Sequence, residues 1–137
     1  MFFKKKESKM SYDLVNVAAL LIHAANIDED FSQKEEEIIE QTLIEIDNNN
    51  SDIKEILKLG KEKENNSNQI LDFTKEVKNL NNTDKIKIVE TLWQIIYSNN
   101  VADMYENNLM RRLGGLLYID PKTMGDIKEK VKKENSK

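Results

Sequence analysis

Four polar side chains lie at matching places in two copies of one short pattern. Asp28 and Glu35 belong to the first copy, and Asn99 and Glu106 occupy the same places 71 residues later. In each copy an apolar stretch leads to a polar loop and then to an acidic helix start. Such a duplication can place two equivalent loops on either side of one internal symmetry axis. The carboxylates of both copies could then face one shared polar site.

Two helical hairpins, over residues 15–46 and 86–117, must position those side chains. The first hairpin opens with apolar residues at helical spacing, which predicts a helix over residues 11–26. Ser32 and Glu35 then form a capping box, in which each side chain bonds the backbone N–H of the other residue. The second helix is therefore predicted to begin at Ser32.

The second hairpin repeats this plan. Its first helix is predicted to open at Thr83 or Asp84. Asp103 and Glu106 form the second capping box, which opens the next helix. Glu35 and Glu106 both occupy the third helical position of a capping box. Helix capping is therefore one possible role of these two acids, and contribution to a shared polar site is the other.

Three more helices complete the predicted fold. Ser51 caps a third helix, residues 62–68 form a polar break, and a fourth helix follows with Phe73 on its apolar stripe. Asp120 caps the last helix, with Pro121 at its first position, where a missing N–H costs little. We therefore predict a single all-α domain, a bundle of about seven helices with an internal duplication of a helical hairpin. Its expected core consists of Leu21, Ile22, Ile38, Leu43, Phe73, Trp93, Ile96, Leu109 and Leu117.

Composition narrows the class of protein. The chain has 137 residues, which fits one domain, and a formal charge of −4. That charge disfavours a nucleic-acid binder, since such proteins gain affinity from clustered Lys and Arg. The chain has no cysteine, which excludes disulfides and Cys-ligated zinc and is compatible with the cytoplasmic location that we expect.

The ends of the chain and its longest apolar run bear on membrane contact. Residues 14–27 are interrupted by polar side chains and fall short of the roughly 20 apolar residues of a membrane span. We expect residues 1–10 to be a flexible tail, residues 11–133 to be the domain, and residues 134–137 to be a second tail. The aromatic and lysine side chains of the first tail would support at most a peripheral contact with an anionic membrane.

Three segments, residues 70–75, 92–97 and 105–112, carry a resemblance to a known family. Together with the two repeated loops, they resemble the tellurite-resistance-protein-B-like (TerB-like) family over nearly the whole chain. That family includes the N-terminal domain of a membrane-anchored DnaJ-type co-chaperone. The resemblance implies an all-helical bundle with an internal repeat, and a metal site built from acidic residues is suspected in the family. The biochemical activity of most members is unknown.

The resemblance also implies a ligand set. Each family repeat carries an Asp and, seven positions later, a Glu, which correspond to Asp28 and Glu35 in the first repeat and to Asn99 and Glu106 in the second. His23 stands where many relatives have an acid, although a core or rim position satisfied by a neighbour is the alternative for this residue. Oxygen ligands suit Mg²⁺ and Ca²⁺, whereas a histidine nitrogen favours Zn²⁺ or Ni²⁺, so the resemblance implies a divalent ion without naming it.

Two departures from the family pattern affect the loops. Glu29 and Asn100 replace glycines, so a left-handed turn is harder to make at Glu29 and moderately harder at Asn100. Asn99 replaces an acid, which keeps a carbonyl ligand and removes one negative charge. Phe31 and Ala102 keep the apolar position of each repeat.

The sequence contains no catalytic constellation. It has one histidine, no nucleophile with a base at motif spacing and no glycine-rich phosphate loop, so we do not expect an enzyme. Arg111 and Arg112 are expected to pair with nearby acids. We predict a non-enzymatic interaction or scaffold module in stress response, with an unidentified protein partner. The alternative is a divalent-metal-binding or metal-sensing protein, and a metal-dependent hydrolase acting through Asp28 and Glu106 is a distant third.

Overall fold

A computed structural model describes residues 2–26, 32–46, 52–66, 71–97 and 104–135. The described residues form seven α-helices and no strand, which confirms the predicted all-α fold. The predicted duplication of a hairpin stays a prediction. The helices are α1 (Phe2–Asn26), α2 (Gln33–Ile46), α3 (Ile53–Asn65), α4 (Leu71–Val77), α5 (Asn82–Tyr97), α6 (Met104–Leu116) and α7 (Pro121–Asn135).

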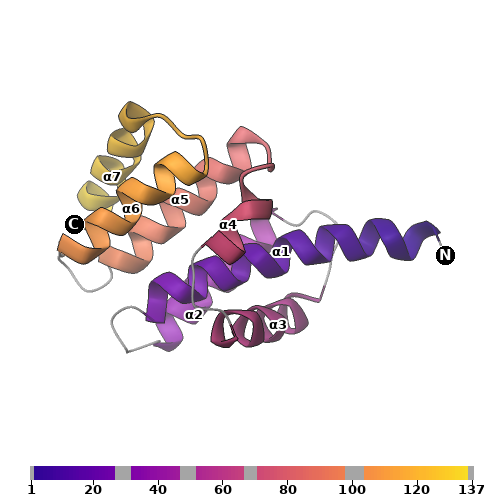
Figure 1. Cartoon of the computed structure of the whole chain (residues 1–137). Coiled ribbons are helices and arrows are strands. Elements are labelled where there is room, and N and C mark those ends of the chain that lie inside the picture. Colours follow the sequence, from indigo (N-terminus) through magenta and orange to yellow (C-terminus); the bar gives the residue numbers. More distant parts are fainter. Residues whose placement is uncertain (1, 27–31, 47–51, 67–70, 98–103, 136–137) are drawn as a thin grey trace.

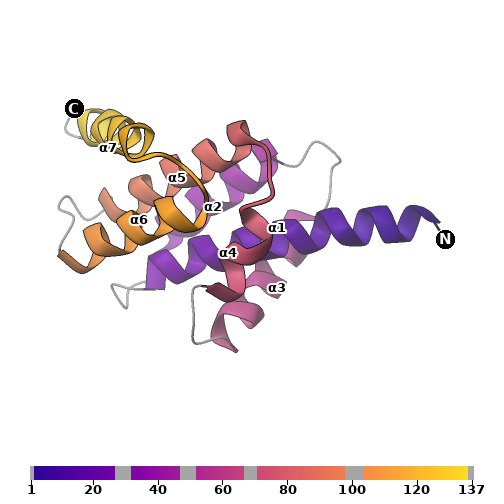
Figure 2. The same cartoon turned by 45° about the horizontal axis from the view of Figure 1, so that its top comes forward.

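Helix α1 runs through the middle of the bundle. Every residue from Asn16 to Ile22 is buried, so this part of the helix is covered on all sides. The cover comes from α2, α3, α4 and α5, each of which packs against α1 (Figures 1 and 2). The N-terminal part of α1 extends beyond the other helices in both views.

Both chain ends are more helical than expected. Helix α1 begins at Phe2, not near Ser11, because residues 2–10 include neither Gly nor Pro and nothing in them ends a helix. Helix α7 likewise runs to Asn135, into the expected C-terminal tail. The helical starts and ends were therefore misplaced, while the flexibility of the tails stays a prediction.

The core agrees largely with the prediction. Seven of the nine expected residues are buried, whereas Ile38 and Leu109 are partly buried and pack at the edge of the core. Helix α5 is the second central element, with nine buried residues, and α7 and α2 both pack against it. Two threonines link α2 to α5 within this core, with the Oγ1 atoms of Thr42 and Thr91 2.7 Å apart.

Helix starts follow the capping rules, although not always at the expected residue. The Ser32 N–H donates to Glu35 Oε1 (2.9 Å) and Ser32 Oγ accepts from the Glu35 N–H (3.1 Å), which confirms the first capping box. Asp120 precedes Pro121 at the start of α7, also as predicted.

Other helix boundaries correct the prediction. Asp52, not Ser51, is the N-cap of α3, and Asn81, not Thr83 or Asp84, accepts from the Asp84 N–H at the start of α5 (2.8 Å). Ser, Asp and Asn cap helices about equally well, so sequence alone does not choose between neighbours. Helix α3 also continues to Asn65, into the predicted polar break, since Glu and Lys residues there favour a helix as much as a loop. Asp103, the cap expected for α6, lies outside the described residues.

A close helix contact and a tight corner hold the layers in place. Gly60 of α3 lies against α1, where an added Cβ would be 2.7 Å from Ala18 Cβ and 3.2 Å from the Ala19 backbone nitrogen. At the other side of the molecule, α6 ends in a Schellman motif, with Tyr118 in the left-handed region at φ 60°. The Ile119 N–H donates to the Gly114 carbonyl (2.9 Å) and turns the chain into α7.

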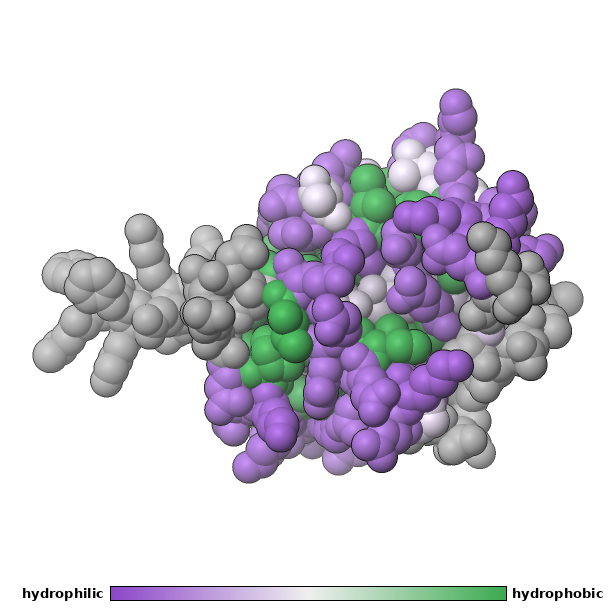
Figure 3. Space-filling view, turned by 180° about the vertical axis from the view of Figure 1, so that it is seen from behind, coloured by the Kyte–Doolittle hydropathy of each residue, from purple (hydrophilic) through white to green (hydrophobic). Residues whose placement is uncertain are grey.

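The surface is mainly polar on the face shown in Figure 3. Hydrophilic residues cover most of it, and hydrophobic ones form small patches separated by hydrophilic residues. Among the described residues, no helix has the length and apolar character needed to cross a bilayer.

Candidate functional sites

The two hairpins bring four helix ends to one end of the molecule. The C-terminal ends of α1 and α5 lie there, together with the N-terminal ends of α2 and α6 (Figures 1 and 2). Three of the predicted ligands belong to these helices, namely His23, Glu35 and Glu106. Asp28 and Asn99 lie outside the described residues.

Glu35 is buried at the start of α2, where it is 3% exposed. Its Oε1 accepts from both the N–H and the hydroxyl of Ser32 (2.9 and 3.0 Å). Glu35 therefore has the helix-capping role that was one of its two predicted alternatives. One carboxylate oxygen is therefore engaged by the helix start itself.

Glu106 is equally buried, 3% exposed, in the first turn of α6. Its charge acts on Tyr97 at the end of α5. Burial raises the pKa of Tyr97, and the nearby charges of Glu129 and Glu106 raise it further. The charge at the start of α6 therefore acts on a buried phenol at the end of α5.

His23 takes part in a polar cluster at the C-terminal ends of α1 and α3. Its Nδ1 lies 3.5 Å from Glu64 Oε1, and Asn26 Nδ2 donates to Glu64 Oε2 (3.0 Å). The imidazole also lies against Phe73, with ring centroids 5.8 Å apart. Glu64 is therefore the polar neighbour of His23. His23 occupies the rim position that was the alternative to a role as a metal ligand.

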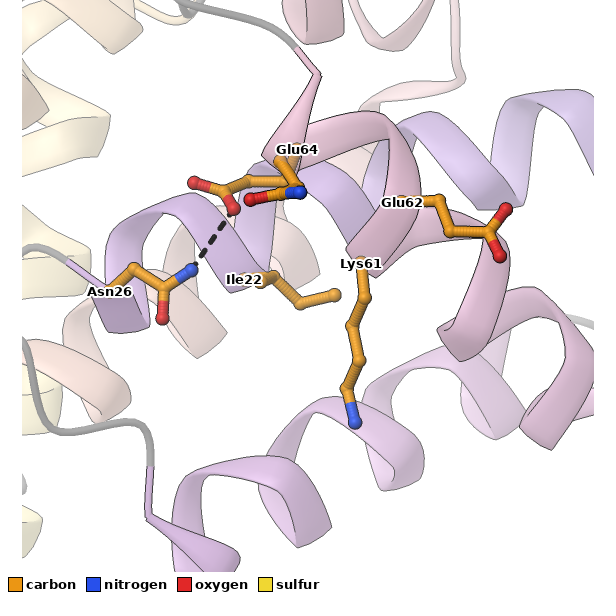
Figure 4. Close-up of a pocket in the computed structure, with 6 residues that line it drawn as sticks. Ile22, Asn26, Lys61, Glu62 and Glu64 are labelled. Atoms are coloured by element: carbon orange, nitrogen blue, oxygen red, sulfur yellow. Dashed lines mark hydrogen bonds between the residues drawn. The ribbon is translucent and has the colours of Figure 1, made fainter.

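A shallow hollow of about 420 Å³ adjoins this cluster (Figure 4). Asn26 and Glu64 meet on one side of it, and Ile22 points into the space between α1 and α3. Lys61 points toward α2, where it forms an ion pair with Glu36 (2.7 Å). Glu64 lies in the polar break predicted over residues 62–68, so the sequence did not predict this cluster.

The described parts of the chain contain no group of three His, Cys, Asp or Glu side chains that could hold a metal ion. Since Asp28 and Asn99 lie outside those parts, the five-residue ligand set stays a prediction.

A larger hollow, which we call the α6–α7 groove, lies between α6 and α7 and measures about 840 Å³. Its lining is mainly small or apolar, with amides and two cations at its edges. The lining residues are Trp93, Asn107, Asn108, Met110, Arg111, Gly114, Gly115, Ile119, Pro121, Met124, Gly125 and Lys128. Arg111 was expected to pair with an acid, but no ion pair joins it to a described acid, and it lines the groove instead.

Trp93 lines the α6–α7 groove from α5. The side chain is 3% exposed, and its indole Nε1 has no hydrogen-bond partner among the described residues. Lys128 Nζ lies 5.3 Å from the centre of the indole ring, and the Tyr97 ring stacks on Trp93 at 5.6 Å. The sequence predicted the burial of Trp93 but could not predict that its indole N–H would have no acceptor in the described part of the chain.

The chain matches the sequence model of a known family. The sequence model of the family described as tellurite resistance protein TerB matches residues 14–129. No curated protein and no solved structure matches the chain.

Proposed function

The chain belongs to the tellurite resistance protein TerB family, and on that premise we propose that it is a non-enzymatic interaction module of a stress response. In this proposal it binds a protein partner in the α6–α7 groove, in the cytoplasm. The observation that supports it most directly is the groove itself, because an open apolar hollow rimmed by polar side chains is typical of a docking site.

Glycines make this groove accessible to another chain. At Gly115 and Gly125 an added Cβ would meet no atom within 4 Å, so both sides of the groove have unfilled space. Gly114 differs, since its Cβ would press on the Met124 side chain at 3.0 Å. Methionine adapts its shape easily, which suits a surface that must fit a partner.

Site-specific photo-crosslinking tests the proposal. A photoreactive amino acid at Asn108, which is exposed and lines the groove, should capture the partner, whereas the same group at Lys122 of α7 should not. The captured protein would be identified, purified and titrated against the chain. Binding should be lost in Gly115→Leu, which fills the groove. Equal capture at both positions, or binding unaffected by Gly115→Leu, would contradict the proposal.

Divalent-metal binding is the second candidate function. It is favoured by two carboxylates, Glu35 and Glu106, that are both buried at helix starts on one end of the molecule. The test is thermal unfolding of metal-stripped protein with Zn²⁺, Ni²⁺, Ca²⁺ or Mn²⁺, repeated on Asp28→Ala and Glu106→Ala, with Asp126→Ala as the control. A ligand that binds only the native state raises the midpoint. No rise with any of these ions would eliminate this candidate.

A further inference from the structure

We propose, building on the proposed function, that the occupant of the α6–α7 groove is an acidic amphipathic helix of the partner protein. Its apolar side chains would lie between α6 and α7, and its carboxylates would face Arg111 and Lys128. Three independent features of the groove lead to this occupant: the shape of its walls, the sign of its charges and the indole N–H of Trp93.

The walls of the groove favour a helix over an extended segment. An extended peptide is usually bound through the free edge of a sheet, and the described part of the chain is helical without strands. Two helices that diverge around an apolar floor instead accept a third helix, which packs its own ridge of side chains into the space. Gly115 and Gly125 leave room on both walls for that ridge to approach closely.

The charges of the groove favour an acidic occupant. Among the described residues, the charged side chains that line it are Arg111 and Lys128, both cationic, although the whole chain carries a net charge of −4. Two other hollows differ, since each contains glutamates as well as lysine. Carboxylates on the occupant would thus find two cations and no repelling acid among the described lining residues.

Trp93 supplies the third feature. A buried indole N–H normally has a hydrogen-bond partner, and a donor left without one is costly. Nε1 of Trp93 has no such partner among the described residues, and the ring lines the groove beneath Lys128. A carboxylate drawn to the Lys128 ammonium would lie beside the indole ring, and a shift of that ring would bring the buried Nε1 within reach of the new acceptor.

Trp93 also makes the inference easy to test, because it is the only tryptophan of the chain. Its fluorescence and its single indole N–H signal in NMR report directly on the groove. The probes are two synthetic helical peptides that share a row of leucines at every third and fourth position. One carries Glu on both flanks of that row, and its twin carries Lys at the same places.

The acidic peptide should change the Trp93 fluorescence and move the indole N–H signal downfield. The Lys twin should bind on the order of tenfold more weakly, since two exposed ion pairs turn from attraction to repulsion. The difference should shrink as salt is added. Arg111→Glu should abolish the preference, because the lining then presents one acid and one cation, whereas Arg112→Glu, the same change one residue away and outside the groove, should leave it intact.

Two results would overturn the inference in distinguishable ways. If both peptides bind equally and Gly115→Leu blocks both, the groove is a docking site without charge selection, so the proposed function survives and the acidic helix does not. If neither peptide affects Trp93, the helical occupant is wrong. The crosslinking experiment at Asn108 then tests the proposed function separately, because it uses neither peptide.

Discussion

Lys85 is a buried cation whose neighbours are helix ends. The side chain is 8% exposed, and its Nζ donates to the Leu117 carbonyl (2.9 Å) and contacts the Lys78 carbonyl (3.5 Å). Both carbonyls belong to the C-terminal ends of helices, α6 and α4, where unpaired acceptors and the helix dipole attract a positive charge. One ammonium group therefore ties the ends of two helices to α5.

We expect Lys85→Met to lower the free energy of unfolding by about 1–3 kcal/mol, because it leaves buried carbonyls without a donor. Urea denaturation followed by circular dichroism measures the change. Lys87→Met on the same helix is the control, since Lys87 makes only a surface ion pair with Glu45 and should contribute about 1 kcal/mol at most. If the Lys85 variant and wild type are equally stable, the free-energy cost of removing the ammonium from water equals the free energy gained from its hydrogen bonds.

Tyr118 occupies a backbone conformation that suits glycine. Its φ of 60° places a bulky residue in the left-handed region, at a cost of roughly 1–2 kcal/mol. Tyr118→Gly should therefore raise stability by about 0.5–1 kcal/mol, after the greater freedom of glycine in the unfolded chain is subtracted. Tyr118→Ala controls for the loss of the ring, which Lys78 Nζ approaches at 5.8 Å. A stability gain of the same size in Ala would contradict a backbone cause.

At this scale, what the sequence could predict depends on distance along the chain. The bonds between Ser32 and Glu35 were predictable, because capping joins residues three apart. The contact of His23 with Glu64 and the unpartnered N–H of Trp93 were not, since both depend on how separate helices pack. The left-handed backbone conformation of Tyr118 was also not predictable, because tyrosine is a residue type that rarely adopts it.

At the scale of elements, Gly60 sets the distance between α1 and α3. In most helices Gly→Ala stabilises by about 0.5–1 kcal/mol. At Gly60 we expect the opposite, a loss of about 1–3 kcal/mol, because the new Cβ would meet the Ala18 side chain and the α1 backbone. Gly115→Ala is the matched control, with open space around its Cβ, and should stabilise. Thermal unfolding compares the two, and a stabilising Gly60→Ala would show that α1 and α3 can separate without cost.

The start of α7 should depend on pH. Hydrogen bonding by Thr123 to the Asp120 carboxylate lowers the pKa of Asp120. A lowered pKa contributes stability that is present above the ordinary Asp value of about 4 and is lost as pH falls through the lower, folded value. Between those values, stability should therefore fall less steeply with decreasing pH in Asp120→Ala than in wild type. Parallel curves from pH 6 to pH 2 would contradict the role of this cap.

Element boundaries show where local rules stop. Asp120 and Pro121 marked the start of α7 correctly, because Pro at the first position permits few alternatives. The polar run after Lys61 was predicted to be a break, but α3 continues into it as far as Asn65. Its Glu and Lys residues permit either state, and the bond from Asn26 of α1 to Glu64 favours the helix. Contacts of this kind are formed only in the folded molecule.

For the whole molecule, the shared core predicts cooperative unfolding. Helices α2, α3, α4 and α5 pack directly on α1, whereas α6 reaches it through α4, and α7 reaches it through α5. We expect one transition, with Trp93 fluorescence and circular dichroism coinciding in urea. Since Lys128 and Met124 of α7 line the groove beside Trp93, fluorescence that changes first would instead show that α7 detaches as a separate unit.

The burial of α1 on every side also has a consequence for synthesis on the ribosome. The helix is complete at Asn26, yet the last of the helices that cover it, α5, ends at Tyr97. At about 5–20 residues per second, this separation leaves its apolar surface without its full native cover for on the order of several seconds. During that interval the nascent chain exposes an apolar helix that chaperones and other nascent chains can bind. Slowing translation between α1 and α5 should therefore increase aggregation more than slowing it after Tyr97.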